Sequence, residues 1–436
     1  MKNKIKRFLS IGLLKLKTLW GNGAFHVLGG SFLNKFVSMF ASIVIVRTLS
    51  KSDYGVLSYV ENIYNYAFIF AGLGLSNTIL RYVVLAKDIE KKKSFYDYAL
   101  KRGFIVNCII VSIILFGCQF LNFNESFYNA KELLMILAIA LPFQHILDDY
   151  LLLERAMFSN SRYAYFSFII LVLVLLFRIL GAKVAGIKGV VIFLVIIYLC
   201  ISIILYRNIH NKYFKNIDSE GLTKEEKRVV NIYAIQFMIT NGFWTLFMLN
   251  DTFLLGLFSS SPNVLADYKV ASVLPGCLGM LSGAIGTYVV PYFIKNEQKL
   301  EWVKTNFFKT ILVTFILMAS SALFCVIFGE YLIRIIYGSK YLSVIPVMNI
   351  LLLSAIINGT FRYTCANLFA AMGKIKYNIY SAIAGMFFQI VFSSLLIPKY
   401  GAIGIAFAGV IVYSLMSIIL LFYFNKEYKI FMIKRE

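Results

Sequence analysis

Charged side chains interrupt several long apolar stretches of this sequence, at positions where they could bind an ion or a polar molecule. Lys35, Glu61 and Arg362 each lie far from the ends of the apolar stretch that contains them. A charge at the centre of a bilayer costs about 2.5–3.5 kcal/mol on insertion scales, so such residues usually face one another or a water-filled path. Cations can bind phosphate groups, and carboxylates can carry a proton or Na⁺. The sequence therefore predicts binding or transport chemistry at these positions.

Two groups of residues are candidates for this chemistry. The candidate substrate-binding residues are cations and amides in apolar segments: Asn34, Lys35, Asn62, Arg81, Lys269, Asn358 and Arg362. The candidate ion-coupling residues are acids in the same kind of segment: Glu61, Asp148, Asp149 and Asp251. An internal ion pair, for example between Lys35 and Glu61, explains the deep charges as well as substrate contact does. Arg81 lies near a segment end and can extend to water, and Asp148 and Asp149 can also reach the inner surface.

The composition is that of a membrane protein. Of 436 residues, 60% are hydrophobic and 15% are charged, whereas about a quarter are charged in an average soluble domain. Charge-free stretches of about 20 residues are long enough to cross a bilayer as helices. They lie between Lys188 and Arg207, Lys309 and Glu330, Lys340 and Arg362, Lys376 and Lys399, and Lys399 and Lys426. An open sheet would leave its edge unsatisfied in lipid, so we expect an all-α polytopic fold.

Twelve transmembrane helices are predicted from these patterns. They run at about 23–49, 54–84, 99–122, 131–153, 163–182, 187–206, 230–258, 267–294, 307–328, 343–368, 377–397 and 402–424. With the N-terminus inside, the inward segments hold 30 Lys and Arg residues and the outward segments hold 7. This asymmetry predicts that both termini are cytoplasmic. Residues 1–22 combine basic and apolar residues at helical spacing, which predicts an amphipathic segment on the membrane surface rather than a cleaved signal peptide.

The two halves of the chain repeat one another. Asp53 to Ser58 in "LSKSDYGVLSYV" matches Asp267 to Ser272 with an offset of 214, and "YAYFS" at 163–167 matches "YNIYS" at 377–381 with the same offset. Lys183 to Ile187 matches Lys399 to Ile403 with an offset of 216. Six spans per copy is an even number, so the repeats are parallel, as in several transporters.

The repeat sets the predicted domains. These are an amphipathic segment (1–22), an N-lobe (23–206), a cytoplasmic linker (207–229), a C-lobe (230–424) and a cytoplasmic tail (425–436). Polar residues gather in the first, second and fourth spans of each lobe, and beyond the first four residues of each span the other six hold one charge, Arg178. We therefore expect the two copies to face a shared polar cavity.

Other sites are not indicated. The net charge of +22 is explained by a basic inner face against anionic lipid, without a nucleic acid partner. The six cysteines lack metal or disulfide spacing, and His26, His145 and His210 are too scattered to predict a metal site. The phosphate-binding loop of nucleotide motors is absent. No cofactor is expected, and the energy source is expected to be a proton or Na⁺ gradient.

Four segments carry a resemblance to a known family. They are "GGSFLNKFVSMFASIVIVRTLSKSDYGVLSYV" and "GLGLSNTILRYV" in the first two spans, "ANLFAAMGKIKYN" at 366–378 and "IPKYGAIGIAFA" at 397–408. With these segments, the chain resembles the polysaccharide flippases, the Wzx-type exporters of O-antigen and capsule repeat units. These belong to the superfamily that also holds the MATE drug exporters, the MOP superfamily.

The resemblance implies two lobes that form a V and alternating access in the bacterial cytoplasmic (inner) membrane. The implied substrate is an oligosaccharide on an undecaprenyl diphosphate carrier, for lipopolysaccharide O-antigen or capsule. Lys35, Lys269 and Arg362 could pair with the diphosphate while the polyprenyl tail stays in lipid. A polysaccharide polymerase and a chain-length regulator are the implied protein partners.

Two other functions compete with this hypothesis. A MATE-like exporter of cationic drugs would need an acidic cavity, whereas the deep charges here are mixed and lean cationic. A membrane polymerase or glycosyltransferase would need carboxylates in sizeable outer loops, but the predicted outer loops are about a dozen residues long at most. We therefore do not expect an enzyme, and no catalytic residue is predicted.

Overall fold

The structure is a computed structural model that describes residues 37–120, 123, 125–127, 129–259, 261–296, 298–372, 374 and 376–433. In this part of the chain the backbone forms helices and no strands. The predicted amphipathic segment 1–22 lies outside the described residues. So do Asn34 and Lys35, two of the candidate binding residues.

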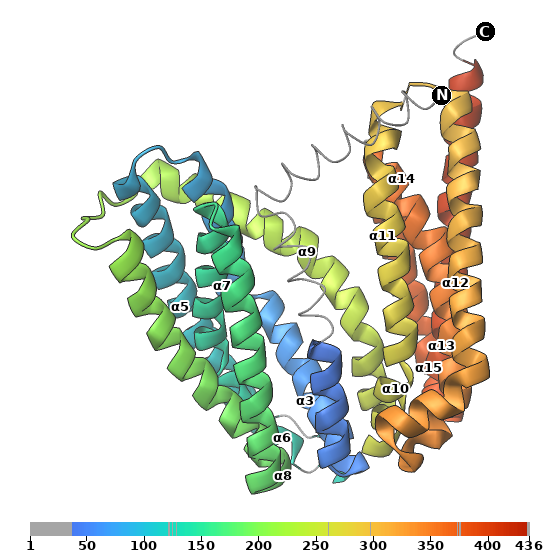
Figure 1. Cartoon of the computed structure of the whole chain (residues 1–436), viewed down its shortest axis with the longest axis horizontal. Coiled ribbons are helices and arrows are strands. Elements are labelled where there is room, and N and C mark those ends of the chain that lie inside the picture. The colour runs from blue at the N-terminus through green and yellow to red at the C-terminus, as the bar shows by residue number, and fades with distance from the viewer. Residues whose placement is uncertain are drawn as a thin grey trace, which may run out of the picture. The chain divides into compact units, whose positions relative to one another are not determined.

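Figure 1 labels the main helices of the fold. A first helix spans Val37–Thr48. The α-helices that follow are α3 (Lys51–Ile69), α4 (Leu75–Thr78), α5 (Ile89–Phe120), α6 (Ala130–Ala138), α7 (Leu141–Ala156), α8 (Asn160–Tyr213), α9 (Lys224–Phe258), α10 (Pro262–Ala271), α11 (Val273–Lys295), α12 (Leu300–Tyr337), α13 (Ile345–Ile357), α14 (Thr364–Ala371) and α15 (Lys376–Ile433). Short 3₁₀ turns are η1 (Ala71–Gly74), η3 (Glu125–Phe127) and η4 (Ser339–Val344), and π turns are η2 (Ile79–Val83) and η5 (Asn358–Tyr363).

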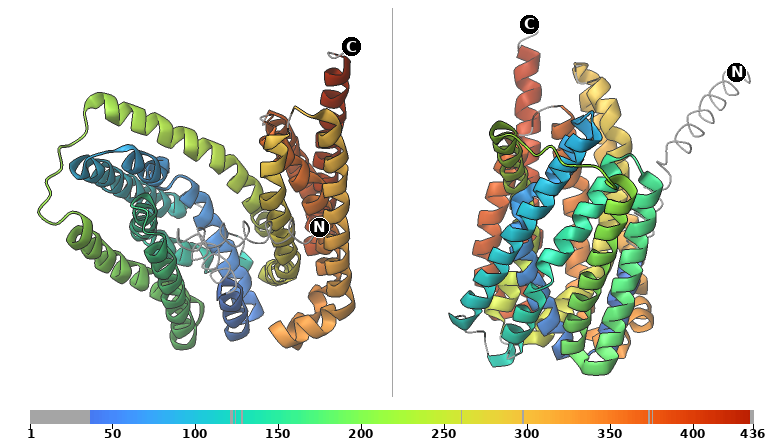
Figure 2. Two further views of the ribbon diagram at one scale, coloured as in Figure 1. Left: turned by 45° about the horizontal axis from the view of Figure 1, so that its top comes forward. Right: turned by 90° about the vertical axis from the view of Figure 1, so that its left-hand side faces the viewer.

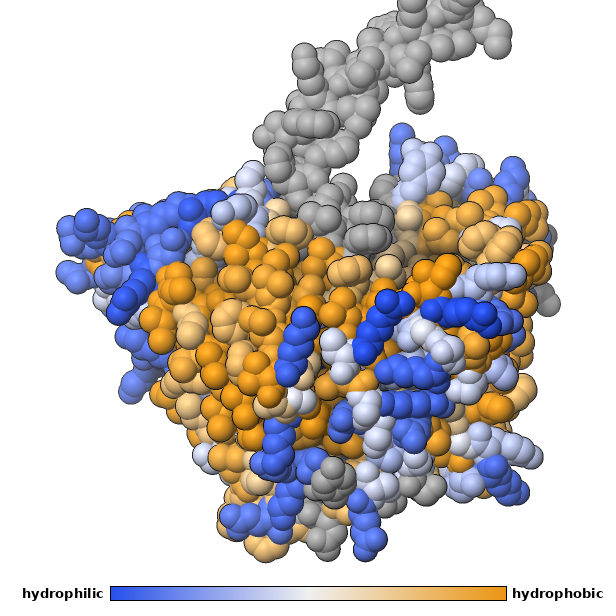
Figure 3. Space-filling model, turned by 60° about the horizontal axis from the view of Figure 1, so that its bottom comes forward, coloured by the Kyte–Doolittle hydropathy of each residue, from blue (hydrophilic) through white to orange (hydrophobic). Residues whose placement is uncertain are grey.

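The helices are those of a multi-pass membrane protein. Among the described residues, six helices are long and apolar enough to cross a membrane, and up to nine if each bent pair counts as one span. Three of the predicted spans are bent: α3 with the turns after it by 42°, α6 with α7 by 45°, and the two parts of α9 by 46°. Much of the surface visible in Figure 3 is hydrophobic, which suits contact with lipid.

The longest helices, α8 and α15, are helical hairpins. A straight helix of 54 residues would be about 80 Å long, far more than the roughly 30 Å of a bilayer core. Gly186 breaks α8 with φ 56°, and Gly401 breaks α15 with φ 53°. The two arms of α8 pack so closely that a Cβ on Gly181 would overlap the Gly189 carbonyl group, and Figure 2 shows these arms side by side in green. Each hairpin supplies two spans, and the total of twelve stays a prediction.

The two hairpin turns correct the register of the predicted repeat. Gly186 (φ 56°, ψ −139°) and Gly401 (φ 53°, ψ −127°) share one backbone conformation, and the offset between them is 215. The sequence alignment had an offset of 216 here and paired Gly186 with Ala402, which is wrong by one position. The reason is physical: a positive φ favours glycine, and it marks equivalent positions better than side-chain similarity does.

The described chain forms two compact units. Of the described residues, unit 1 holds 37–50, 63–120, 123 and most of 129–245, and unit 2 holds 51–62, 125–127 and most of 246–433. Helices α3 and α9 contribute to both units. The non-helical part of the predicted linker is short, because α8 continues to Tyr213 and α9 begins at Lys224. The lobe boundaries drawn from the repeat stay a prediction.

Aromatic and aliphatic side chains fill the core of each unit. In unit 2, Phe307 and Phe424 stack with ring centroids 3.5 Å apart, next to the buried Phe369. In unit 1, α7 packs against both α5 and α8, and Tyr150 and Leu153 are fully buried there. These cores fix the positions of the polar residues on α7 and α15.

The hairpin geometry makes a stability prediction. Replacing Gly181 with alanine places a methyl group against the backbone of the second arm of α8. We expect this overpacking to destabilise the protein by about 1–3 kcal/mol, measured as a lower melting temperature in detergent. The matched control is Gly117→Ala in α5, where an added methyl group meets no atom within 4 Å. An equal melting temperature for both variants would contradict the close packing of the arms.

Candidate functional site

Unit 1 contains a buried acid and histidine on one face of α7. His145 and Asp149 are one helical turn apart and are 1% and 0% exposed. The Nε2 atom of His145 lies 3.3 Å from Oδ2 of Asp149. On the other side of the ring, Nδ1 lies 3.0 Å from Oγ of Ser76. Because Asp149 is fully buried, the expectation that it could reach the inner surface is wrong.

A break in the helical chain after α3 lies directly against the His145 ring. Gly72, Leu73 and Gly74 have φ angles of 54°, 49° and 78°. A Cβ on Gly72 or on Gly103 of α5 would overlap the imidazole, so the histidine fits only because both positions are glycine. The Gly72 N–H group donates a hydrogen bond of 2.9 Å to Oδ1 of Asn107, which satisfies the backbone at the break.

Asp148 faces a different environment from Asp149. It lines a cavity of about 230 Å³ in unit 1. The other lining residues are Ser38, Gln144, Leu147, Leu151, Ser167, Ile170, Leu171, Val174 and Tyr198. The Tyr64 hydroxyl donates a 2.7 Å hydrogen bond to Gln144 Oε1. Asp148 therefore forms part of a cavity wall, whereas Asp149 belongs to the buried pair with His145.

Unit 2 holds the second cluster of candidate residues, around Asp251 of α9. The carboxylate accepts hydrogen bonds from the Tyr268 hydroxyl at 2.9 Å and from the Gln389 side-chain amide. Asn250 Nδ2 donates to Gln389 Oε1 at 3.2 Å, which extends the network. Lys269 lies within electrostatic reach of both Glu61 and Asp251. Positive and negative side chains therefore lie near one another in this unit.

The remaining candidate residues divide into buried and exposed positions. Arg362 belongs to the π turn η5, which begins at Asn358, and it is only 8% exposed. Tyr413 of α15 interacts electrostatically with both Arg362 and Asp251. Asn62 donates to the Leu249 carbonyl at 3.0 Å and so helps to hold α3 to α9 within unit 2. Arg81 is exposed and stacks on Tyr233 at 5.0 Å, as its nearness to a segment end predicted.

A hydrogen-bonded network at the end of α7 was not predicted from the sequence. Glu154 is completely buried, and Arg162 donates to its two carboxylate oxygens at 3.0–3.2 Å. The Tyr213 hydroxyl also donates to Glu154, at 2.9 Å. Unit 2 has a counterpart in which Lys374 and Tyr377 bind Glu427. The two acids are not equivalent in the repeat, because an offset of 214 places Leu368 opposite Glu154 and Glu427 opposite Tyr213. The repeat therefore gave no signal for these networks, and the fold was needed to find them.

The comparisons with known proteins identify the family. Residues 20–297 match the family described as "Polysaccharide biosynthesis protein", which is more than half of the chain. The chain belongs to this family. An uncharacterized membrane protein of Methanocaldococcus jannaschii is 23% identical over 421 residues, covering 91% of this chain and 82% of that protein. The capsular polysaccharide biosynthesis protein CapF of Staphylococcus aureus is 25% identical over 423 residues, covering 91% and 96%.

Solved structures show which proteins share the fold of this member of the polysaccharide biosynthesis family. The lipid II flippase MurJ in an inward closed conformation matches with a TM-score of 0.72 at 16% identity, covering 93% of this chain and 89% of that one. A multidrug resistance MATE family transporter of the MOP superfamily, in an inward-facing conformation, matches with a TM-score of 0.68 at 15% identity, covering 92% and 95%. These likenesses confirm the predicted all-α membrane fold, and the match of residues 20–297 confirms the resemblance to the polysaccharide biosynthesis family.

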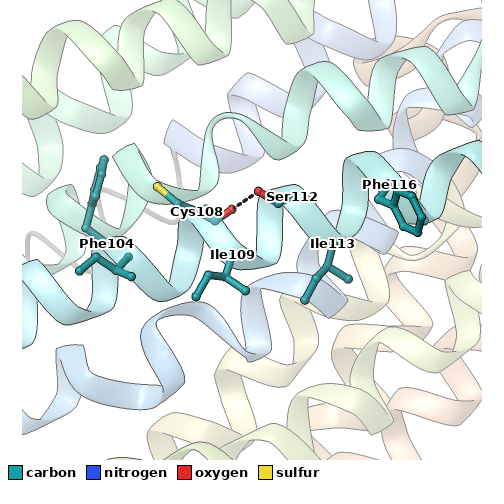
Figure 4. Close-up of a pocket in the computed structure, with 8 residues that line it drawn as sticks. Phe104, Cys108, Ile109, Ser112, Ile113 and Phe116 are labelled. Atoms are coloured by element: carbon teal, nitrogen blue, oxygen red, sulfur yellow. Dashed lines mark hydrogen bonds between the residues drawn. The ribbon is translucent and has the colours of Figure 1, made fainter.

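A hollow of this family member lies on the face of α5. It measures about 640 Å³ and is lined by one helix, from Phe104 to Gly117. In Figure 4 its labelled side chains are mostly apolar, and the Ser112 hydroxyl is satisfied by the Cys108 carbonyl at 2.9 Å. Such a surface suits hydrocarbon chains and offers nothing to hold a charged group.

Glu427 makes a prediction about pH. Burial alone would raise the pKa of this carboxyl, but the hydrogen bonds from Lys374 and Tyr377 outweigh it and lower the pKa below its usual range. A depressed pKa means that the ionised group stabilises the fold above the unfolded-state pKa of about 4.3. This stabilisation is lost as the pH falls through the lower, folded-state pKa. We expect wild type to melt above Glu427→Gln at pH 7 and the difference to close below about pH 4, as measured by thermal unfolding in detergent. A difference in melting temperature between wild type and Glu427→Gln that does not change with pH would contradict a stabilising role for the ionised carboxylate.

Proposed function

We propose that this protein moves undecaprenyl-diphosphate-linked oligosaccharide repeat units from the inner to the outer leaflet of the bacterial cytoplasmic membrane. The repeat units would serve O-antigen or capsule synthesis. The observation that carries the proposal is the match of residues 20–297 to the polysaccharide biosynthesis family. The fold supports it, because the lipid II flippase MurJ has the same architecture. The names of the relatives and structural neighbours describe biosynthesis proteins, flippases and transporters, which supports transport rather than catalysis.

The buried cations of unit 2 suit a diphosphate. Arg362 and Lys269 lie in the same unit as the acids Glu61 and Asp251, so the region can exchange internal pairing for pairing with a substrate anion. A guanidinium group can bind two phosphate oxygens at once. Lys35 is proposed to add a further cation, and Asn34, Asn62 and Asn358 to bind sugar hydroxyls. Arg81 lies at the surface, where it could attract anionic headgroups.

An ion gradient is proposed as the energy source, since the sequence holds no phosphate-binding loop. One charge that crosses a potential of 100 mV releases about 2.3 kcal/mol. The acids proposed to carry the proton or Na⁺ are Glu61, Asp148, Asp149 and Asp251. Both termini are proposed to be cytoplasmic, and a polymerase and a chain-length regulator are the proposed partners that use the flipped unit.

A reconstituted system tests the proposal. Proteoliposomes would contain a fluorescent undecaprenyl-diphosphate oligosaccharide, and a membrane-impermeant quencher would report the fraction in each leaflet. We expect the protein to speed exchange between leaflets and expect collapse of both ion gradients to remove net accumulation on one side. Exchange no faster than in empty vesicles would overturn the function, and accumulation without gradients would overturn the coupling.

A drug antiporter is the second candidate, and the fold of the MATE transporter favours it. The charges gathered in unit 2 include Lys269 and Arg362, which would repel a cationic drug. Overexpression should therefore leave resistance to cationic drugs unchanged. A clear rise in resistance would favour the antiporter over the flippase.

A further inference from the structure

Unit 1 carries cations over aromatic rings near the starts of α5 and α9. Arg102 of α5 and Lys227 of α9 each lie 6.0 Å from the centroid of the Tyr98 ring. The Tyr98 hydroxyl donates a 3.1 Å hydrogen bond to Asn231 Oδ1, which joins the two helices at this point. The two cations therefore share one ring, although they come from helices that are far apart in the sequence.

A third cation extends this surface. Arg81 of η2 lies 5.0 Å from the ring centroid of Tyr233, which belongs to α9. The Tyr82 ring stacks on Phe95 of α5 at 5.4 Å and meets Tyr233 edge-on at 5.8 Å. Phe95 precedes Tyr98 by about one helical turn, so both rings lie on the same face of α5. The aromatic surface is therefore built from η2, α5 and α9.

The three cations are available to an external anion. Arg81, Arg102 and Lys227 are exposed, and they form no ion pair among the described residues. Their neighbour Lys91, in contrast, pairs with Glu226 at 2.8 Å. A cation that lies over an aromatic ring is held by the face of that ring and keeps N–H donors for another partner. Phosphate oxygens are frequent partners of such donors.

An apolar hollow begins on the next turn of α5. Arg102 is followed by the hollow of about 640 Å³, which is lined from Phe104 to Gly117. Figure 4 shows its side chains in a row along the helix. At a rise of 1.5 Å per residue, this row is about 20 Å long. Four of its apolar side chains are 54–64% exposed: Ile105, Ile109, Ile113 and Phe116.

The cations and the hollow together fit a lipid with a phosphorylated head and one long chain. Helix α5 is long and apolar enough to cross a membrane, and its hollow of about 20 Å exceeds half of the roughly 30 Å hydrocarbon core. The acyl chains of a phospholipid end near the bilayer centre, whereas the isoprenoid chain of a carrier lipid is longer. A diphosphate also offers more negative oxygens to three cations than a phosphodiester does.

We propose that this surface of unit 1 is a docking site for an isoprenoid diphosphate lipid. The diphosphate binds Arg81, Arg102 and Lys227, and the chain lies in the hollow of α5. The site is distinct from the buried cations Lys269 and Arg362, which belong to unit 2. That the docked lipid is the molecule to be flipped rests on the proposed function, whereas binding itself does not.

Lipid binding to the purified protein tests the head of the site. Native mass spectrometry in detergent counts bound lipids, with undecaprenyl diphosphate, undecaprenol and phosphatidylglycerol as separate probes. We expect undecaprenyl diphosphate to bind about tenfold or more tightly than the other two. The double variant Arg102→Gln/Lys227→Gln should lose about tenfold or more of this affinity, because its amides carry no charge.

A matched double variant controls for the loss of charge. Lys224→Gln/Arg228→Gln removes two exposed cations from the same end of α9, and neither has a ring contact or an ion pair among the described residues. Its affinity should stay within about twofold of wild type. Unchanged affinity in a folded Arg102→Gln/Lys227→Gln protein would overturn the head site. Equally tight binding of phosphatidylglycerol or undecaprenol would overturn the preference for a diphosphate lipid.

A bulky residue in the hollow tests the place of the chain. Ile113→Trp fills the hollow about 16 Å along the helix from Arg102. We expect it to weaken the binding of undecaprenyl diphosphate and to leave geranyl diphosphate, which has the same head on a short chain, unchanged. Ile383→Trp in α15 is the control, since Ile383 is 65% exposed and Ile113 is 64% exposed. Undiminished binding of undecaprenyl diphosphate, or an equal loss for geranyl diphosphate, would overturn the chain site.

A transport measurement separates docking from flipping. In proteoliposomes with the fluorescent undecaprenyl-diphosphate oligosaccharide, we expect Arg102→Gln/Lys227→Gln to flip slowly at a low mole fraction of substrate and to approach the wild-type rate at a high one. A wild-type rate at every mole fraction would overturn the role of docking in transport. Absence of flipping in wild type would overturn the proposed function, and the binding measurements would still decide whether the docking site exists.

Discussion

Export of the repeat unit is expected to fall by about 100-fold or more when Arg362 is replaced with alanine. Arg362 is only 8% exposed, and it lies in the π turn η5. In the proposed function Arg362 pairs with the substrate diphosphate, and removal of one partner from a buried charge pair costs about 2–5 kcal/mol. A loss of about 3 kcal/mol in transition-state stabilisation corresponds to a rate about 100-fold lower. The measurement is surface polysaccharide in cells that lack the chromosomal gene and carry the variant, with the amount of protein in the membrane checked by immunoblotting.

Two further variants show whether the guanidinium group itself matters. Arg362→Lys keeps the charge but loses the planar fork, so we expect export between that of wild type and Arg362→Ala. Arg334→Ala is the control, because Arg334 is 58% exposed and pairs with the equally exposed Glu330, and its export should stay close to wild type. Lys35→Ala is expected to abolish export as well. Normal export by both Arg362→Ala and Lys35→Ala, at normal protein levels, would remove these residues from the substrate path.

The helices were predictable from the sequence because a helix that crosses a membrane needs about 20 consecutive, mostly apolar residues. The charge-free stretches between Lys309 and Glu330 and between Lys376 and Lys399 lie within α12 and α15. The chain break at Gly72–Gly74 was not predictable in this way. It depends on His145, which comes much later in the chain, on α7, and fills the space that side chains at Gly72 and Gly103 would occupy.

The candidate site was predicted in part for a similar reason. Buried charges are rare enough in apolar segments to be recognised alone, and Asp149 and Asp251 do lie beside other polar side chains. Arg362 is buried in the π turn η5. Gln389 and Tyr268 were missed although they bind Asp251. Glutamine and tyrosine occur in many environments, so only the fold reveals which of them meets an acid.

Loss of Arg162 is expected to destabilise the protein by about 3 kcal/mol or more, since removal of one partner strands a buried charge. Glu154 is 0% exposed, and in wild type Arg162 donates to both of its carboxylate oxygens. In Arg162→Met the carboxylate keeps the Tyr213 hydroxyl at 2.9 Å and the more distant Lys212 ammonium at 3.9 Å. Neither replaces the guanidinium group, so the melting temperature should fall clearly.

Adding Glu154→Gln to Arg162→Met should recover part of this loss, because the stranded charge is then gone and the two changes are coupled. Arg334→Met is the matched control. Arg334 pairs with Glu330 at 2.7 Å, but these side chains are 58% and 59% exposed, and exposed pairs contribute about 0–1 kcal/mol. The melting temperatures of wild type and the three variants in detergent provide the comparison. If Arg162→Met and Arg334→Met have the same melting temperature, another group must compensate the charge of Glu154. The network at the end of α7 would then not contribute more to stability than an exposed ion pair.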